Sequence, residues 1–178
     1  MQLKLKKGYV QVYTGNGKGK TTAAIGQAVR AAGAGLKTFI IQFMKEYPYS
    51  EINSLKELSK WITVEQYGKD DFVYKGAMPG IEDLSAVKRA LIKAEDVLVN
   101  SQFDLVVLDE ILVSIYFKLL TTNNVLNLIN KKPDNMELIL TGRYCPKEII
   151  DKADLVTEMQ EIKHYYLNNV LSRKGIES

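Results

Sequence analysis

The stretch GNGKGKTT, residues 15–22, decides the fold class of this chain. It follows the run GYVQVYT over Gly8–Thr14, which is typical of a β-strand, and precedes an Ala-rich helical pattern over Thr21–Ala32. A glycine-rich turn between a strand and a helix gathers backbone N–H groups and the positive end of the helix dipole around one point. The stretch therefore predicts a phosphate-binding loop, with Lys20 against the outer phosphates and the Thr21 hydroxyl on a magnesium ion.

The loop is one residue shorter than the usual pattern G-x-x-x-x-G-K-[ST], because only NGK separates Gly15 from Gly19. A glycine-rich turn that binds nothing is the alternative. We favour phosphate binding because strand, loop and helix follow one another in the required order. The candidate nucleotide ligands are Thr14, Gly15, Asn16, Gly17, Lys18, Gly19, Lys20, Thr21 and Thr22.

A second candidate feature is the apolar run Asp104–Asp109 (DLVVLD), which predicts a central strand buried on both faces. An apolar strand that ends in carboxylates beside a phosphate loop is where nucleotide-binding folds hold a metal, so we expect Asp109 and Glu110 to join Thr21 there. Acidic residues in solvent at a strand end are the alternative. Two carboxylates also suit ATP hydrolysis, and Arg143 could approach the phosphates. The residues alone leave hydrolysis and group transfer both open.

The rest of the chain alternates short apolar runs with helical patterns. This predicts an α/β fold of the P-loop NTPase (RecA-like) type, with a mostly parallel sheet, helices on both faces and a single domain over residues 1–178. The stretches Lys45–Lys60 and Gly68–Gly80 are expected to be irregular. Further strands are expected over Lys37–Phe43, Trp61–Tyr67, Glu137–Thr141 and Leu155–Met159, and helices over Ile81–Leu98, Asn123–Lys131 and Pro146–Ala153.

The composition excludes several classes of protein. With 46% apolar and 25% charged residues in 178, the chain is of the soluble globular type, and no apolar run approaches the roughly 20 residues needed to cross a bilayer. Lys and Arg are scattered, and the net charge is only +3, so we expect no nucleic-acid partner. The single cysteine, Cys145, excludes an internal disulfide. The N-terminus does not resemble a signal peptide, so a cytoplasmic location is expected.

Five further segments, read together with the loop, resemble the P-loop class of ATP:cob(I)alamin (corrinoid) adenosyltransferases. The resemblance covers nearly the whole chain, from Tyr9 to Glu177. It implies an enzyme, a transferase of alkyl groups, in which a Co(I) corrinoid attacks C5′ of ATP, expels triphosphate and becomes adenosylcobalamin. The segments are VVLDE at 106–110, TGRYC at Thr141–Cys145, ADLVTEM at Ala153–Met159, Lys163-His164, and KGIE at 174–177.

The same resemblance implies roles for individual residues. Asn16 to Thr22 would hold ATP, in the reverse sense to ordinary ATPases, and Thr21 and Glu110, with Asp109, would hold Mg²⁺. His164 would line the site, although a lone histidine is otherwise more often structural. The residues with an expected part in catalysis are Lys20, Phe72, Tyr74, Arg143 and His164.

Phe72 and Tyr74 are expected to lie against the corrin and displace its lower axial ligand. The usual family pattern is Phe-x-Trp, so Tyr74 departs from it, and without the resemblance both residues would be interpreted as loop anchors packed on the core. The chain also departs from the family after Lys163-His164, where Leu167 and Asn169 stand in place of Asp and Gly. Asparagine tolerates positive φ, so we expect the turn at Asn169 to survive.

The resemblance further implies a homodimer and a reducing electron donor such as a flavoprotein. Two other functions stay open at this point. One is an ATPase or nucleotide kinase on the same fold, and the other is a non-catalytic module that binds a corrinoid or ATP. A RecA-like strand-binding protein is disfavoured, because the sequence has no basic patch interleaved with aromatic residues.

Overall fold

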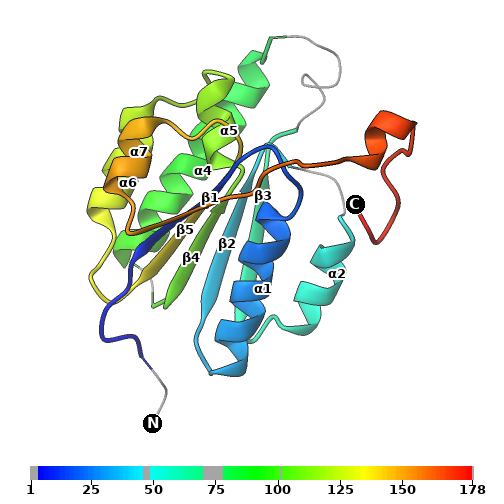
Figure 1. The fold of residues 1–178 in the computed structure, drawn as a ribbon. Helices are drawn as coiled ribbons and strands as arrows, with labels where there is room; N and C mark the ends of the chain where they lie inside the picture. Colours follow the sequence, from blue (N-terminus) through cyan, green and yellow to red (C-terminus); the bar gives the residue numbers. More distant parts are fainter. Residues whose placement is uncertain (1–3, 46–48, 70–77, 101, 178) are drawn as a thin grey trace.

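The computed structural model describes residues 4–45, 49–69, 78–100 and 102–177, and its centre is a six-stranded sheet (Figure 1). The strand order is β3-β2-β4-β5-β1-β6, and every neighbouring pair is parallel. The predicted α/β fold is confirmed, and it is consistent with a P-loop NTPase-like domain. The strands are β1 (Val10–Thr14), β2 (Thr38–Phe43), β3 (Ile62–Tyr67), β4 (Leu105–Asp109), β5 (Glu137–Thr141) and β6 (Leu155–Glu158).

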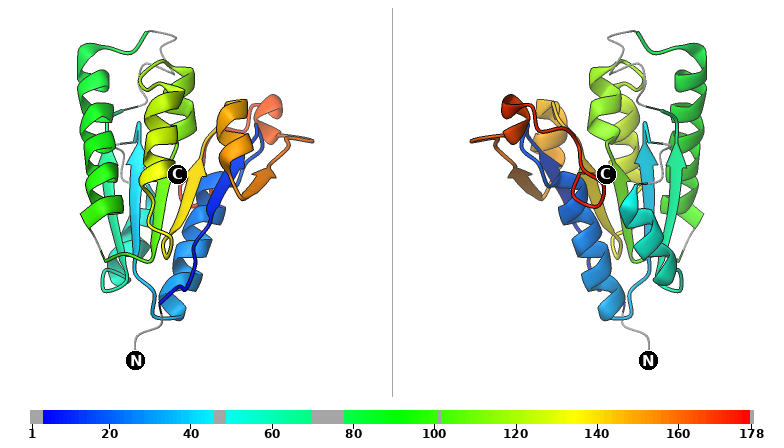
Figure 2. Two further views of the ribbon diagram at one scale, coloured as in Figure 1. Left: turned by 90° about the vertical axis from the view of Figure 1, so that its left-hand side faces the viewer. Right: turned by 90° about the vertical axis from the view of Figure 1, so that its right-hand side faces the viewer.

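Helices cover both faces of the sheet, as the two side views in Figure 2 show. On one face lie α1 (Lys20–Gly33) and α2 (Ser50–Glu57). On the other lie α4 (Ile81–Asn100), α5 (Ile111–Tyr116), α6 (Thr122–Lys131) and α7 (Lys147–Lys152). The short 3₁₀ helix η1 (Tyr165–Asn168) belongs to the C-terminal segment, which crosses the end of the sheet in Figure 1.

Strand β4 explains why its sequence is apolar without alternation. Val106 and Leu108 belong to the core on the α4 side, whereas Leu105 and Val107 belong to the core on the α1 side. All four residues are buried, as expected for a strand covered by helices on both faces. The strand therefore ends with its last side chain, Asp109, inside the protein rather than in solvent.

The strand order positions the candidate site. In a parallel sheet the carboxyl ends of all strands lie at one edge, where ligands of such folds bind. Strand β5 lies between β1, which leads into the glycine loop, and β4, which ends in the carboxylates. Thr141, the last residue of β5, therefore lies between the two features that the sequence singled out.

The predicted strands agree with the observed ones to within two residues at each end, but the prediction of an irregular Lys45–Lys60 was wrong. Residues Ser50–Glu57 form α2, which buries only Leu55 and therefore lacks a clear apolar period. The apolar run Ile111–Tyr116 was not predicted as a helix because it is short and without period. Pro146 precedes α7 as its N-cap instead of opening its first turn.

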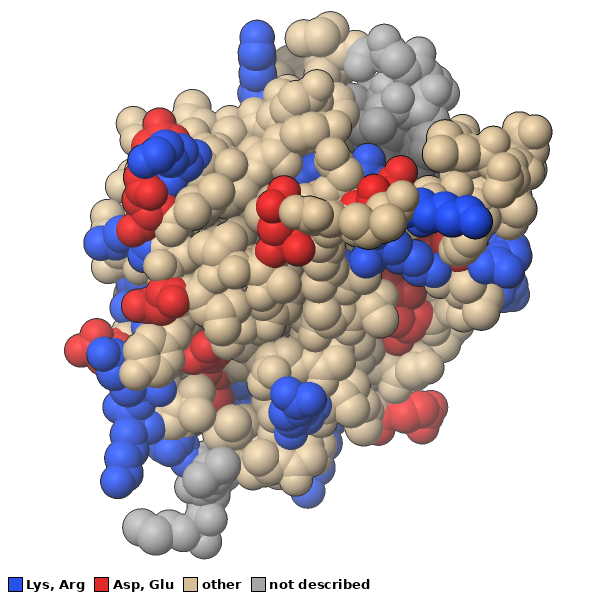
Figure 3. All heavy atoms as spheres, viewed as in Figure 1, with Lys and Arg blue, Asp and Glu red and all other residues tan. Residues whose placement is uncertain are grey.

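The surface carries mixed charge on the face shown in Figure 3, where basic side chains are interspersed with acidic ones. On this face they do not form the continuous basic band by which proteins bind a nucleic-acid backbone. No helix within the described ranges is both long and apolar enough to cross a membrane.

Gly142 supplies a test of how β5 meets α5. It has a φ of +141°, and a Cβ added there would lie 2.8 Å from Leu112 Cβ and 2.9 Å from the Val113 backbone nitrogen. We expect Gly142→Ala to lower the free energy of unfolding by about 2 kcal/mol or more, because strain and overlap add. Urea denaturation measures the change.

Gly26 is the matched control, since it lies inside α1 and an added Cβ there would meet nothing within 4 Å. Gly26→Ala is expected to raise stability by about 0.5–1 kcal/mol, because glycine loses more backbone entropy in a helix than alanine does. Equal urea midpoints for Gly142→Ala and the unmodified chain would contradict the proposed close packing.

Candidate active site

The glycine loop has the backbone geometry of an anion-binding turn. Gly15 and Gly19 take positive φ values of 95° and 120°, which side chains other than glycine rarely adopt. Helix α1 begins at Lys20 with no side-chain hydrogen bond at its N-cap and no acidic residue in its first turn. The first N–H groups of this helix therefore keep their capacity to bind an anion, which the helix dipole also favours.

Lys20 is already held over the loop. Its side chain is buried, with 6% exposure, and its Nζ donates to the carbonyl oxygens of Gly15 and Gly17 at 2.7 Å each. Burial, and to a smaller degree the positive charge of Arg143, lower the pKa of Lys20, although Glu110 opposes this. An anion in the loop would stabilise this partly desolvated ammonium.

The two residues that follow β6, Met159 and Gln160, contact the same loop. The Gly17 N–H donates to the Met159 carbonyl at 2.7 Å, and a Cβ at Gly17 would lie 2.7 Å from the Gln160 carbonyl oxygen. A Cβ at Gly15 would lie only 2.4 Å from the Met159 oxygen. These close approaches explain why glycine is needed at Gly17, and they add to the positive φ as a reason for glycine at Gly15.

Asp109, at the end of β4, is buried and accepts four hydrogen bonds. Its Oδ1 accepts from the hydroxyls of Thr21 at 2.9 Å and Thr141 at 2.7 Å. Its Oδ2 accepts from Gln42 Nε2 at 3.1 Å and from Lys45 Nζ at 2.7 Å. Burial alone would raise the pKa of Asp109, but the Lys45 charge and these hydrogen bonds outweigh it and lower the pKa.

Glu110 has a different environment. It adopts a left-handed φ of 62°, its backbone N–H donates to Thr141 Oγ1 at 2.9 Å, and it lines the cleft described below. Burial, followed by the neighbouring negative charge of Asp109, raises the pKa of Glu110. Of the two predicted metal-binding carboxylates, Glu110 lines the cleft together with Thr21, whereas Asp109 lies behind Thr21.

The donor set fits Mg²⁺ that arrives with a nucleotide. No group of three or more His, Cys, Asp or Glu residues able to hold a metal ion occurs within the described residues. Magnesium needs no such cage, since it keeps several waters and is commonly held by one or two carboxylates and the substrate phosphates. The Thr21 hydroxyl and the Glu110 carboxylate supply oxygens of this kind.

The loop opens into a cleft of about 1230 Å³. Ligand sites are commonly about 300–1,000 Å³, so this cleft has room for more than a nucleotide. The loop, the start of α2, the α5 region and the C-terminal segment all contribute to its walls. The lining includes Asn16, Gly17, Lys18, Gly19, Lys20, Thr21, Thr22, Lys45, Tyr49, Glu110, Tyr116, Arg143, Tyr144, His164, Tyr166 and Glu177.

The other predicted site residues divide into three groups. Arg143 and His164 line the cleft, and His164 Nδ1 also accepts the Tyr166 backbone N–H at 3.0 Å, which caps η1. Thr14 is not part of the lining, and its carbonyl accepts from the Met159 N–H at 2.8 Å. Phe72 and Tyr74 lie outside the described residues.

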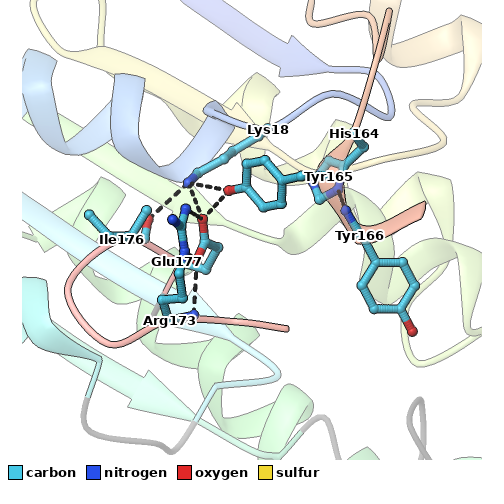
Figure 4. A network of polar contacts seen from close by, with 7 residues as sticks. All are labelled: Lys18, His164, Tyr165, Tyr166, Arg173, Ile176 and Glu177. Atoms are coloured by element: carbon cyan, nitrogen blue, oxygen red, sulfur yellow. Dashed lines mark hydrogen bonds and ion pairs between the residues drawn. The ribbon is translucent and has the colours of Figure 1, made fainter. Parts of the chain in front are cut away.

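The C-terminal segment folds over the loop through Lys18 (Figure 4). Lys18 Nζ donates to Glu177 Oε1 at 3.0 Å and to the Ile176 carbonyl at 2.9 Å. Arg173 and the Tyr165 hydroxyl also contact the Glu177 carboxylate, and these contacts hold its pKa well below its usual range. Lys18 is therefore engaged by the segment that closes one side of the cleft. The expected positive φ at Asn169 is confirmed, at 61°.

Sequence reasoning missed several residues of the site. Gln42 and Lys45 contact Asp109, and the only available signal was a polar residue at the end of an otherwise apolar strand. Tyr116 and Tyr144 stack at the cleft wall with ring centroids 4.1 Å apart. Nothing predicted this pair, because α5 was not recognised and the two residues are distant in sequence.

Thr141 tests the network around Asp109. Its buried hydroxyl donates to Asp109 and accepts from the Glu110 N–H, so Thr141→Val leaves both buried groups short of a partner. We expect the free energy of unfolding to fall by about 2 kcal/mol. Thermal or urea denaturation measures it.

Thr38→Val is the control, because Thr38 is equally buried and its Oγ1 is the one buried side-chain polar atom without a hydrogen-bond partner among the described residues. That variant is expected to be as stable as the unmodified chain or more so. If Thr141→Val and Thr38→Val change the free energy of unfolding equally, the Thr141 hydroxyl does not stabilise the two carboxylate residues.

Comparison with known proteins shows which family the chain resembles. The family model for ATP:corrinoid adenosyltransferase BtuR/CobO/CobP matches residues 6–178. The corrinoid adenosyltransferase of Escherichia coli (strain K12) is 34% identical over 173 residues, which cover 97% of this chain and 86% of that protein. Corrinoid adenosyltransferase CobA of Salmonella typhimurium is 33% identical over 177 residues, 99% of this chain and 88% of that protein.

The corrinoid adenosyltransferase of Pseudomonas aeruginosa is 29% identical over 177 residues, which cover 99% of this chain and 86% of that protein. The resemblance stated from the sequence is thus confirmed. The chain belongs to the ATP:corrinoid adenosyltransferase family.

Proposed function

We propose that this chain transfers the 5′-deoxyadenosyl group of ATP to the Co(I) centre of a reduced corrinoid and releases triphosphate. Family membership supports ATP-dependent adenosyl transfer to a corrinoid and gives no support to an ATPase, a kinase or a non-catalytic module. One observation carries the proposal. The glycine loop, with the uncapped N-terminus of α1, opens into a cleft that is larger than a nucleotide needs. Such a site can hold two substrates at once.

Triphosphate binding is proposed to use the loop N–H groups, Lys20 and Arg143. Lys20 Nζ now contacts two loop carbonyls, and phosphate oxygens would offer it stronger, charged acceptors. Arg143 lines the same cleft and can add a second positive charge. Lys18, held by Glu177, is proposed to keep the C-terminal segment beside the nucleotide.

Thr21 and Glu110, with Asp109, are proposed to hold Mg²⁺ when the nucleotide is bound. The ion would neutralise charge on the triphosphate as it leaves. Asp109 is proposed to orient Thr21, since its Oδ1 accepts a hydrogen bond from the Thr21 hydroxyl at 2.9 Å. Thr141 links the two carboxylates by donating to Asp109 and accepting from the Glu110 N–H.

The proposed step needs no general base. The electron pair of Co(I) forms the cobalt–carbon bond, the C5′–O bond breaks, and its electron pair stays on the triphosphate. No proton leaves the nucleophile, so the site contributes alignment and neutralisation of the leaving group. His164, whose Nδ1 already accepts a backbone N–H, is proposed to line the site without proton transfer.

The remaining partners are proposals from the family resemblance. They are an electron donor such as a flavoprotein, which would reduce the corrinoid to the Co(I) state, and a second copy of the chain in a homodimer. A cytoplasmic location is also proposed. Phe72 and Tyr74 are proposed to contact the corrin, as the sequence pattern indicates.

The identity of the products tests the proposed reaction. Anaerobic incubation of the protein with ATP, Mg²⁺ and chemically reduced cobalamin is expected to give light-sensitive adenosylcobalamin and intact triphosphate. Visible spectroscopy and anion-exchange chromatography follow the two products. ADP and phosphate with an unchanged corrin spectrum would indicate an ATPase, whereas binding without any product would indicate a carrier.

Lys20→Ala tests the loop as the triphosphate site. We expect kcat/KM for ATP to fall about 100-fold or more, because a preorganised charge on the leaving group is lost. Lys131→Ala is the control, since Lys131 forms an exposed ion pair with Glu95 on α4 and is not part of the cleft lining. An unchanged rate for Lys20→Ala would exclude the loop from the reaction.

A further inference from the structure

We propose, on the basis of the ATP and metal binding proposed above, that the ammonium group of Lys45 takes the place of the metal ion when no nucleotide is bound. In the nucleotide-free protein its ammonium neutralises Asp109 and contacts Thr21. It must move away when the metal binds. Lys45 would thereby make metal binding depend on the nucleotide.

The contacts of Lys45 support this assignment. Its Nζ lies 2.7 Å from Asp109 Oδ2 and 3.2 Å from Thr21 Oγ1. The side chain is 12% exposed and that of Asp109 is 1% exposed, so little water separates the charges. The ammonium also lies 5.2 Å from the centre of the Tyr49 ring, which lines the cleft.

These contacts place a positive charge where a phosphate loop offers oxygens to a metal. The threonine hydroxyl of the loop and a carboxylate at the end of an apolar strand, here Thr21 and Asp109 at the end of β4, are the usual protein donors to that ion. Lys45 holds both, since Thr21 Oγ1 accepts from the ammonium while it donates to Asp109. A divalent cation and an ammonium repel each other strongly at such distances, so the two cannot share these oxygens.

A bound triphosphate changes the balance. Lys45 lines the cleft with Lys20 and Arg143, so phosphate oxygens can receive the displaced ammonium. Without a nucleotide, displacement would cost Lys45 its 2.7 Å contact with the buried Asp109 carboxylate and would bring no triphosphate charge in its place. Metal binding should therefore be weak in the free protein and strong with ATP, and linkage requires each ligand to favour the other.

A lysine with a purely structural role predicts something different. Its removal would leave the buried Asp109 charge unpaired and lower stability, with no gain in metal affinity. The two roles are separated by measuring the metal itself in the absence of nucleotide. Mn²⁺ serves as the probe because its free ion is counted directly by electron paramagnetic resonance.

The experiment compares Mn²⁺ binding to the full chain and to Lys45→Met without nucleotide. We expect Lys45→Met to bind Mn²⁺ at least about tenfold more tightly, a difference of roughly 1.4 kcal/mol. Lys131→Met, which removes an exposed lysine of the Glu95 ion pair, is expected to leave the affinity unchanged. Mn²⁺ should also raise the melting temperature of Lys45→Met more than that of the unmodified chain.

The double variant Lys45→Met/Asp109→Asn guards against poor folding, because it leaves no unpaired charge. It is expected to bind Mn²⁺ no more tightly than the unmodified chain. An affinity of Lys45→Met equal to or below that of the unmodified chain would overturn the proposal, as would a gain that persists in the double variant. If these results occur while the unmodified chain still forms adenosylcobalamin and Lys20→Ala still lowers kcat/KM for ATP, the adenosyl-transfer function stands and only the role of Lys45 is lost.

Discussion

The buried carboxylate of Asp109 is the constraint on which the rest of the site depends. It accepts hydrogen bonds from α1 through Thr21, from β2 through Gln42, from β5 through Thr141, and from Lys45 just beyond β2. A charge so deeply buried is tolerated only when its oxygens are satisfied in this way. Its four partners therefore fix how the phosphate loop stands relative to three strands of the sheet.

This arrangement gives the two carboxylates different environments. Asp109 accepts its four hydrogen bonds inside the protein, whereas Glu110 takes a left-handed backbone conformation and lines the cleft. Positive charge at the cleft comes from Lys20, Lys45 and Arg143, and the loop adds uncapped N–H groups. Such a site is suited to grip a highly charged triphosphate, and a triphosphate is the leaving group when C5′ is attacked. We therefore propose that the shortened glycine loop holds the leaving group.

The sequence predicted those features that depend on local pattern. Glycine spacing located the loop, and continuous apolar runs located β2, β4 and β5, because a strand buried on both faces admits few polar residues. It did not predict α2, whose stability comes from tertiary contacts made through Leu55 rather than from its own period. Nor did it predict the contact of Lys18 with Glu177, residues 159 positions apart, or that Asp109 would lie behind the Thr21 hydroxyl and outside the cleft lining. These depend on how distant segments fold together.

If the loop holds the group that leaves, the bond broken is C5′–O and the bonds between the phosphates survive. An ATP analogue with an imido group between its β- and γ-phosphates tests this directly. We expect this analogue to adenosylate reduced cobalamin, with release of the intact imido-triphosphate, at a rate comparable to that with ATP. Failure of the bound analogue to donate its adenosyl group, under conditions where ATP does, would show that cleavage between the phosphates is required and that the loop does not hold an intact leaving group.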